Sequence, residues 1–90
     1  MAKAGMNFED ALHEVKLGER VFRSGWNGKD MYVELQGADS RDVVNLPYLC
    51  LIYRPCVVYP MGARVPWLAS QTDLLTDDWC LYIEKEEENG

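Results

Sequence analysis

The sequence has little that would support a metal centre, a disulfide framework or a membrane anchor. It contains three cysteines and one histidine, and the cysteines lack the CxxC spacing of structural zinc sites. It has no run of about 18 apolar residues, the length that a membrane-spanning helix needs. Residues 1–5 lack the apolar segment of a signal peptide. We therefore expect free, buried thiols, no metal, no cofactor and a cytoplasmic protein.

Positive charge is also scarce. The chain carries 9 Lys and Arg residues against 15 Asp and Glu residues, which gives a formal net charge of −6. Long-range repulsion then argues against nucleic-acid polymers and anionic membranes as partners. Part of the charge lies in residues 84–90, which we interpret as an acidic tail after a folded core of residues 6–83. With 90 residues in all, we expect a single domain over 1–90.

The first part of the chain has the pattern of an amphipathic helix. Asn7 can cap its first turn, because its side-chain oxygen can accept a hydrogen bond from a free amide there. Apolar residues then recur at helical spacing from Phe8 to Val15. Gly18 follows, and glycine is the usual residue for a left-handed helix end. His13 lies off the apolar stripe, and we interpret it as a surface residue.

Strand patterns occupy the middle of the chain. Residues 20–23 and 31–36 alternate as strands, and Asn27-Gly28 between them favours a hairpin turn, because both residues tolerate positive φ. The apolar run 48–53 is too short to assign by period and fits a strand or a helical turn.

The second half of the chain predicts another hairpin, a short helix and a last strand. Residues 56–59 and 64–67 predict the two strands of that hairpin. Pro66 cannot donate to a ladder, so the second strand is a sheet edge or ends there. A helix over 68–75 and a strand over 79–83 complete the chain. The fold class is therefore α+β: a small antiparallel sheet of about four or five strands, with an N-terminal helix packed on one face and a short helix before the last strand.

Two tryptophans, Trp67 and Trp79, bracket the stretch that is richest in short polar side chains. These side chains are Ser70, Gln71, Thr72, Asp73, Thr76, Asp77 and Asp78. One interpretation is structural: a helix capped by Ser70 or Thr72, with the tryptophans in the core. The other is a ligand site, since aromatic surface stacks a ring while polar groups orient it. Trp79 alternates with Leu81 and Ile83, which favours a core position for its own side chain.

The order of these segments resembles one family. Residues 6–12 resemble its first helix, and Gly25-Trp26-Asn27-Gly28-Lys29 resembles its first hairpin. Tyr53-Arg54-Pro55 resembles the start of its middle strand. Residues 65–75, Val-Pro-Trp-Leu-Ala-Ser-Gln-Thr-Asp-Leu-Leu, with Asp78-Trp79, resemble its C-terminal signature. This family of small phage and prophage domains includes the second class of Thoeris anti-defence proteins. The resemblance covers most of residues 6–83 and departs between 41 and 59, where the chain is shorter and more apolar.

The resemblance implies a phage anti-defence sponge, which binds the cyclic nucleotide signal of a bacterial immune sensor and holds it without cleaving it. In the Thoeris case the signal is a cyclic ADP-ribose isomer, and some relatives look able to take cyclic oligonucleotides. The resemblance also implies a homotetramer with pockets shared between protomers, in the cytoplasm of the infected bacterium.

The residue types agree with that chemistry. Indoles stack well on adenine, amides read ring or ribose edges, and hydroxyls and a carboxylate suit ribose. Free amides at the start of the 70–75 helix would suit a phosphate. Lys29 and one of Arg20, Arg23 or Arg54 would offset the charge of a pyrophosphate. The predicted ligand-binding residues are Trp26, Asn27, Gly28, Lys29, Trp67, Ser70, Gln71, Thr72 and Asp73.

Two other functions remain open from the residues alone. An enzyme could degrade the same signal with Asp73, Asp77 or Asp78 as base or Mg²⁺ ligand, although no histidine lies nearby. Alternatively, a phage structural or host-binding module would use exposed tryptophans as interface anchors.

Overall fold

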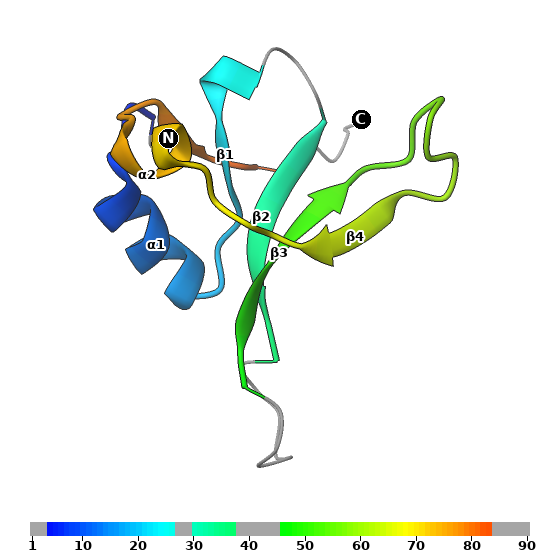
Figure 1. The fold of residues 1–90 in the computed structure, drawn as a ribbon, viewed down its shortest axis with the longest axis horizontal. Helices are drawn as coiled ribbons and strands as arrows, with labels where there is room; N and C mark the ends of the chain where they lie inside the picture. The colour runs from blue at the N-terminus through cyan, green and yellow to red at the C-terminus, as the bar shows by residue number, and fades with distance from the viewer. Residues whose placement is uncertain (1–3, 27–29, 38–45, 84–90) are drawn as a thin grey trace.

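A computed structural model describes residues 4–26, 30–37 and 46–83 of the chain (Figure 1). In chain order, the helices and strands are α1 (Phe8–Lys16), β1 (Val21–Arg23), the 3₁₀ turn η1 (Ser24–Trp26), β2 (Met31–Gln36), β3 (Tyr48–Tyr53), β4 (Ala63–Pro66), α2 (Gln71–Leu75) and β5 (Trp79–Leu81). The predicted α+β class is confirmed, including the N-terminal helix and the short helix before the last strand.

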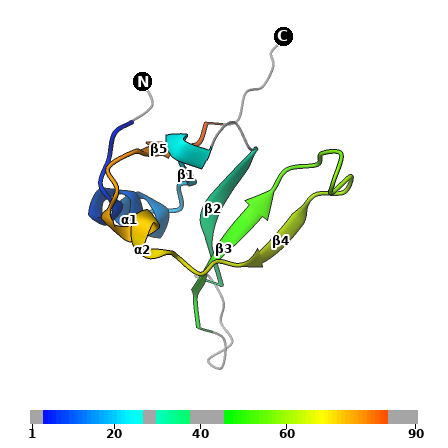
Figure 2. The same ribbon diagram turned by 45° about the horizontal axis from the view of Figure 1, so that its top comes forward.

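The five strands form one antiparallel sheet in the order β4-β3-β2-β1-β5 (Figure 2). The β2–β3 pairing is the longest and runs from Met31 opposite Tyr53 to Gln36 opposite Tyr48. The last strand, β5, returns to pair with β1, with Arg23 opposite Trp79. Strand β4 is therefore one edge of the sheet, as Pro66 predicted, because proline has no amide to donate to a further strand.

Helix α1 forms where local signals agree. The Asn7 side chain accepts a hydrogen bond from the Asp10 amide at 2.9 Å, and the chain leaves the helix through Gly18 at φ 98°. Ala11 and Val15 are fully buried against the sheet. This helix is the predicted one, with the predicted cap and apolar face.

The core lies between α1 and one end of the sheet. It consists of Met6, Ala11, Val15, Val21, Val33 and Trp79. Trp79 has no exposed surface, so its predicted core position is confirmed. Helix α2 lies beside α1 at this end, and the β3–β4 hairpin extends from the other (Figure 1).

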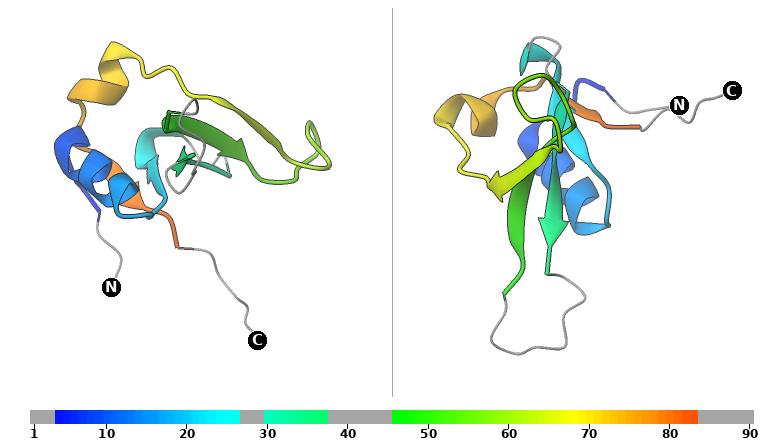
Figure 3. Two further views of the ribbon diagram at one scale, coloured as in Figure 1. Left: turned by 90° about the horizontal axis from the view of Figure 1, so that it is seen from below. Right: turned by 90° about the vertical axis from the view of Figure 1, so that its right-hand side faces the viewer.

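The second hairpin differs from its prediction. Its first strand is β3, which settles the ambiguous run 48–53, whereas residues 56–59 lie in the β3–β4 loop, not in a strand (Figure 3). Pro55 and Pro60 flank those residues and lack ladder amides, and the Cys56 amide instead bonds the Tyr59 carbonyl at 2.9 Å. The loop closes at Gly62 (φ 76°), where a Cβ would lie 2.9 Å from the Tyr53 carbonyl oxygen.

The first hairpin begins with a 3₁₀ turn. After β1 the chain forms η1, which places Trp26 at the end of the described segment. The predicted Asn27-Gly28 turn and Lys29 lie outside the described residues, as do the tail 84–90 and most of the loop before β3. Within the described segments, no helix is both long and apolar enough to cross a membrane.

Candidate functional site

The three tryptophans form one aromatic cluster. The indole of Trp79 contacts Trp26 at 5.5 Å between ring centroids and Trp67 at 5.7 Å. Both contacts are edge-to-face, with interplanar angles of 78° and 86°. Phe8 of α1 packs on Trp67 and Trp79 from the other side. The structure therefore brings Trp26 and Trp67 to one cluster although they are far apart in sequence, with Trp79 as their common neighbour.

Both outer tryptophans keep part of their surface exposed. Trp79 is buried completely, whereas Trp26 and Trp67 are half-buried and pack on the edge of the core. An indole held on one side and open on the other is suited to stacking a flat ligand, because little conformational freedom is lost on binding. Trp26 and Trp67, the two predicted stacking residues, are both partly exposed and both packed against the core cluster.

The N-terminus of α2 is built as a capping box. The Ser70 hydroxyl accepts from the Asp73 amide at 3.0 Å, and the Asp73 carboxylate accepts from the Ser70 amide at 2.8 Å. Ser70, not Thr72, is therefore the cap. The anionic group at this helix end is the protein's own carboxylate, so Ser70 and Asp73 have a structural task here. Gln71 and Thr72 are exposed beside them.

Arg23 joins the end of β1 to Asp73 in the first turn of α2 and to Asp78 after the helix. Its Nη1 donates to Asp73 Oδ1 at 2.8 Å, and its Nε donates to Asp78 Oδ1 at 2.8 Å. Asp78 Oδ2 also accepts from the Gly25 amide in η1 at 3.1 Å. We call these four residues, Arg23, Gly25, Asp73 and Asp78, the Arg23 clamp. They connect the segment that carries Trp26 to the segment that carries Gln71 and Thr72.

The pKa values follow from these contacts. The hydrogen bond from Arg23 lowers the pKa of the Asp78 carboxyl, and bonds from Thr76 and Gly25 add to the effect. Burial alone would raise the pKa of Asp73, but the hydrogen bonds from Ser70 and Arg23 outweigh it and the pKa is lowered. The bond to Asp78 in turn raises the pKa of Arg23. The clamp is therefore a fully ionised network at neutral pH.

The other predicted cations are placed elsewhere. Arg20 pairs with Glu34 at 3.3 Å and lies over the Tyr32 ring, on the next strand. Arg54 donates to the Tyr82 hydroxyl at 2.6 Å. Arg23, bound by two carboxylates, is not free to meet a phosphate. The remaining predicted cation, Lys29, is three residues after Trp26 in the sequence. It lies outside the described residues.

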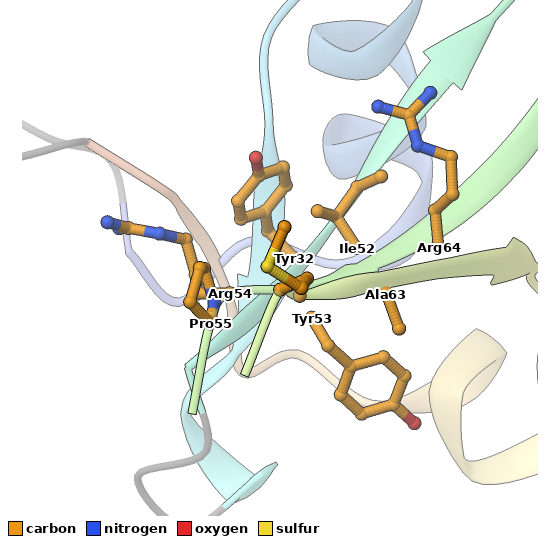
Figure 4. Close-up of a pocket in the computed structure, with 9 residues that line it drawn as sticks. Tyr32, Ile52, Tyr53, Arg54, Pro55, Ala63 and Arg64 are labelled. Carbon is orange, nitrogen blue, oxygen red and sulfur yellow. The ribbon is translucent and has the colours of Figure 1, made fainter. Parts of the chain in front are cut away.

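A cavity that the sequence did not indicate lies at the base of the β3–β4 hairpin. It has a volume of about 380 Å³ and is lined by Tyr32, Ile52, Tyr53, Arg54, Pro55, Met61, Gly62, Ala63 and Arg64. Ile52 and Tyr53 project to opposite sides of β3, and Arg54 and Arg64 stand at two sides of the opening (Figure 4). The residues that line this cavity come from three strands and a loop, so no single segment of the sequence indicates it.

Acidic residues near α2 do not gather as metal ligands. Asp73 and Asp78 both face Arg23, and Asp77 is exposed. No group of three or more His, Cys, Asp or Glu side chains is arranged to hold a metal ion anywhere in the described part of the chain.

Comparison with known proteins identifies the family of this chain. A family model for the Thoeris anti-defense 2-like domain matches residues 6–82, which include every helix and strand. The chain is also similar to the protein called Thoeris anti-defense 2 of Bacillus phage SP01, with 34% identity over 87 residues, covering 86% of this chain and 94% of that relative. The chain therefore belongs to the Thoeris anti-defense 2-like family, and its role is anti-defence.

Proposed function

We propose that this protein is a sponge, which binds a cyclic nucleotide signal of bacterial immunity in the cytoplasm of the infected cell and sequesters it intact. The ligand class is a cyclic ADP-ribose isomer, with cyclic oligonucleotides as further candidates. The observation that carries the proposal is the pair of half-buried indoles, Trp26 and Trp67, held on a common buried tryptophan.

Stacking supplies the main attraction in this proposal. Each base stacked on an aromatic side chain contributes about 1–3 kcal/mol. The exposed Gln71 and Thr72 stand near Trp67 in the chain and offer donors and acceptors for ring or ribose edges. Asn27, Gly28 and Lys29 continue directly from Trp26 and would supply an amide, a close backbone approach and a positive charge. Ser70 and Asp73 then act by shaping α2.

The ionic state of the carboxylates supports binding without turnover. A general base works best with a pKa near the operating pH. The pKa values of Asp73 and Asp78 are instead lowered, and their oxygens are occupied by Arg23, Ser70, Gly25 and Thr76. Those carboxylates are weak bases in this setting.

A shared pocket between protomers fits the exposed apolar surface. Leu68 and Leu75, which flank the predicted site, are 92% and 81% exposed in the single chain. A second copy packed on this end would cover them and close the open side of the indoles. We therefore extend the proposal to a homo-oligomer, a tetramer in the family pattern, in which each pocket has walls from two protomers.

A thermal-shift panel tests the ligand class. The panel contains cyclic ADP-ribose, its glycosidically linked isomers, cyclic dinucleotides and cyclic trinucleotides. A ligand that binds only the native state raises Tm in proportion to the logarithm of its concentration. We expect a cyclic ADP-ribose isomer to give the largest shift. No shift with any compound would contradict the proposal.

Heat release separates a sponge from an enzyme. The protein is incubated with the best ligand, denatured by heat and filtered, and the filtrate is analysed by mass spectrometry. Recovery of intact ligand at one equivalent per site is the expected result. Cleaved ligand in the filtrate would instead identify an enzyme that degrades the signal.

A further inference from the structure

The segment that carries Trp26 contacts both Trp79 and Asp78. The Trp26 ring contacts the Trp79 ring, and the Ser24 amide donates to the Asp78 carbonyl at 3.0 Å. The Gly25 amide also donates to the Asp78 carboxylate. Asp78 therefore contacts this segment through both its main chain and its side chain.

The same carboxylate is tied to α2 through Arg23. Arg23 bridges Asp78 and Asp73, and Asp73 closes the capping box of α2. The side chains of Arg23 and Asp73 are 14% and 11% exposed, so water screens their interaction weakly. The planar guanidinium fork fixes the directions of both carboxylates, which a point charge could not do.

Gly25 lies in close contact with this ion pair. A Cβ at Gly25 would lie 2.7 Å from Asp78 Oδ2 and 3.1 Å from Arg23 Nη2. Real Cβ atoms essentially never come within 3.0 Å of another heavy atom, so a larger residue at position 25 must shift the Asp78 carboxylate or the turn. The turn thus approaches the ion pair as closely as glycine allows.

We propose that the Arg23 clamp is a positioning device, which sets the distance and orientation between the Trp26 turn and α2 and thereby the affinity for the ligand, without touching the ligand. A network of this kind contributes little net stability, because the desolvation of its charges offsets much of their attraction. Its value is geometric, since one guanidinium donates to both carboxylates and so fixes where each lies. This inference rests on the proposed function, because it assigns the clamp to that same site.

Asp78→Asn tests the clamp, with Asp77→Asn as the matched control. Both substitutions remove one negative charge at neighbouring positions, but Asp77 is exposed and has no side-chain partner among the described residues. In Asp78→Asn, one carboxylate oxygen is replaced by an NH₂ group, which cannot accept from either Arg23 or the Gly25 amide. By calorimetry with the cyclic ADP-ribose isomer of the panel, we expect Asp78→Asn to weaken binding by about tenfold or more. The control should stay within about twofold.

A second readout separates positioning from general destabilisation. The indole N–H resonances of Trp26 and Trp67 are assigned with Trp26→Phe and Trp67→Phe. In folded Asp78→Asn without ligand, the Trp26 resonance should shift or broaden while that of buried Trp79 stays in place. This measurement needs no ligand, so it judges the clamp even if the wild-type protein binds nothing and the proposed function fails.

Gly25→Ala provides an independent variant that keeps every charge. It should weaken binding and shift the Trp26 resonance in the same direction as Asp78→Asn. Wild-type affinity in a folded Asp78→Asn variant, or an unmoved Trp26 resonance, would overturn the proposal. Loss of folding in both variants would also overturn it, because the clamp would then be a global structural element.

Discussion

The two ends of the sheet are held by different kinds of contact. At the α1 end, the tryptophan cluster is joined to the Arg23 clamp by the Trp79 indole, whose Nε1 donates to the Asp73 carbonyl at 2.9 Å. At the hairpin end, the β3–β4 loop holds Val57 and Met61 at 97% and 92% exposure. The α1 end has an ion-paired network and an aromatic cluster, with Leu68 and Leu75 exposed beside them, whereas the described contacts of the hairpin loop leave Val57 and Met61 in solvent.

We relate this difference to two functions, ligand binding at the α1 end and contact with another molecule at the hairpin end. A site that binds a rigid ligand needs residues whose positions are fixed before binding, because ordering them afterwards costs affinity. The α1 end provides such residues. An exposed apolar loop on a single chain is instead a surface for contact with another copy or another molecule. The predictions below test this separation in order of expected effect.

Trp79→Ala should cause the largest loss. Trp79 is the largest fully buried side chain and touches Phe8, Trp26 and Trp67. Replacing such a residue by alanine costs about 3–5 kcal/mol of unfolding free energy. Urea unfolding followed by circular dichroism measures it. Met61→Ala is the control and should leave the unfolding midpoint nearly unchanged; equal losses in both would contradict the division between the two ends.

Trp26→Ala and Trp67→Ala should each weaken ligand binding strongly while the protein still unfolds cooperatively. Each indole is proposed to stack on the ligand, and the loss of one stacked base costs about 1–3 kcal/mol, or roughly five- to a hundredfold in Kd. Calorimetry measures the change, and Tyr59→Ala in the distant loop is the aromatic control. Wild-type affinity in either tryptophan variant would mean that the pocket lies elsewhere, with the cavity between Tyr32 and Arg64 as the next place to test.

Acid should weaken the α1 end through the clamp. The pKa values of Asp73 and Asp78 are lowered in the folded state, so the unfolded chain binds more protons in acid. Their stabilisation is complete above the unfolded carboxyl pKa of about 3.9 and is lost as pH falls through the folded values. Thermal unfolding at a series of pH values should therefore show a shallower acid decline in Asp78→Asn than in wild type. Asp77→Asn should keep the wild-type slope.

Local signals determined how much of this structure could be predicted from the sequence. Helix α1 was predicted with its cap because Asn7, the apolar spacing and Gly18 act over one or two turns. Residues 56–59 were wrongly assigned to a strand because β-branched residues suggested one, and two prolines prevented it. The partners of Arg23 are 50 and 55 residues away in the chain, so no local pattern could show that this arginine is committed to Asp73 and Asp78.

The candidate site shows the same limit. The residue types of the Trp67–Asp73 stretch indicate a polar site, but only the fold separates the exposed Gln71 and Thr72 from Ser70 and Asp73, which bond to each other in the capping box. The cavity at the hairpin was missed since its walls join residues from 32 to 64. Long-range pairing, not composition, decides which polar groups stay available to a ligand.

The smallest effect on the single chain is expected from the double substitution Val57→Ser and Met61→Ser. Both side chains are almost fully exposed, so the change in the unfolding free energy of the chain should lie within about 0.5 kcal/mol per site. If this loop is covered by another copy, the same substitutions reduce the mass measured by light scattering at micromolar concentration. Leu17→Ser, an exposed apolar residue at the end of α1, is the control. An unchanged mass in an oligomeric protein would place the contact between copies on another surface, such as the one around Leu68 and Leu75.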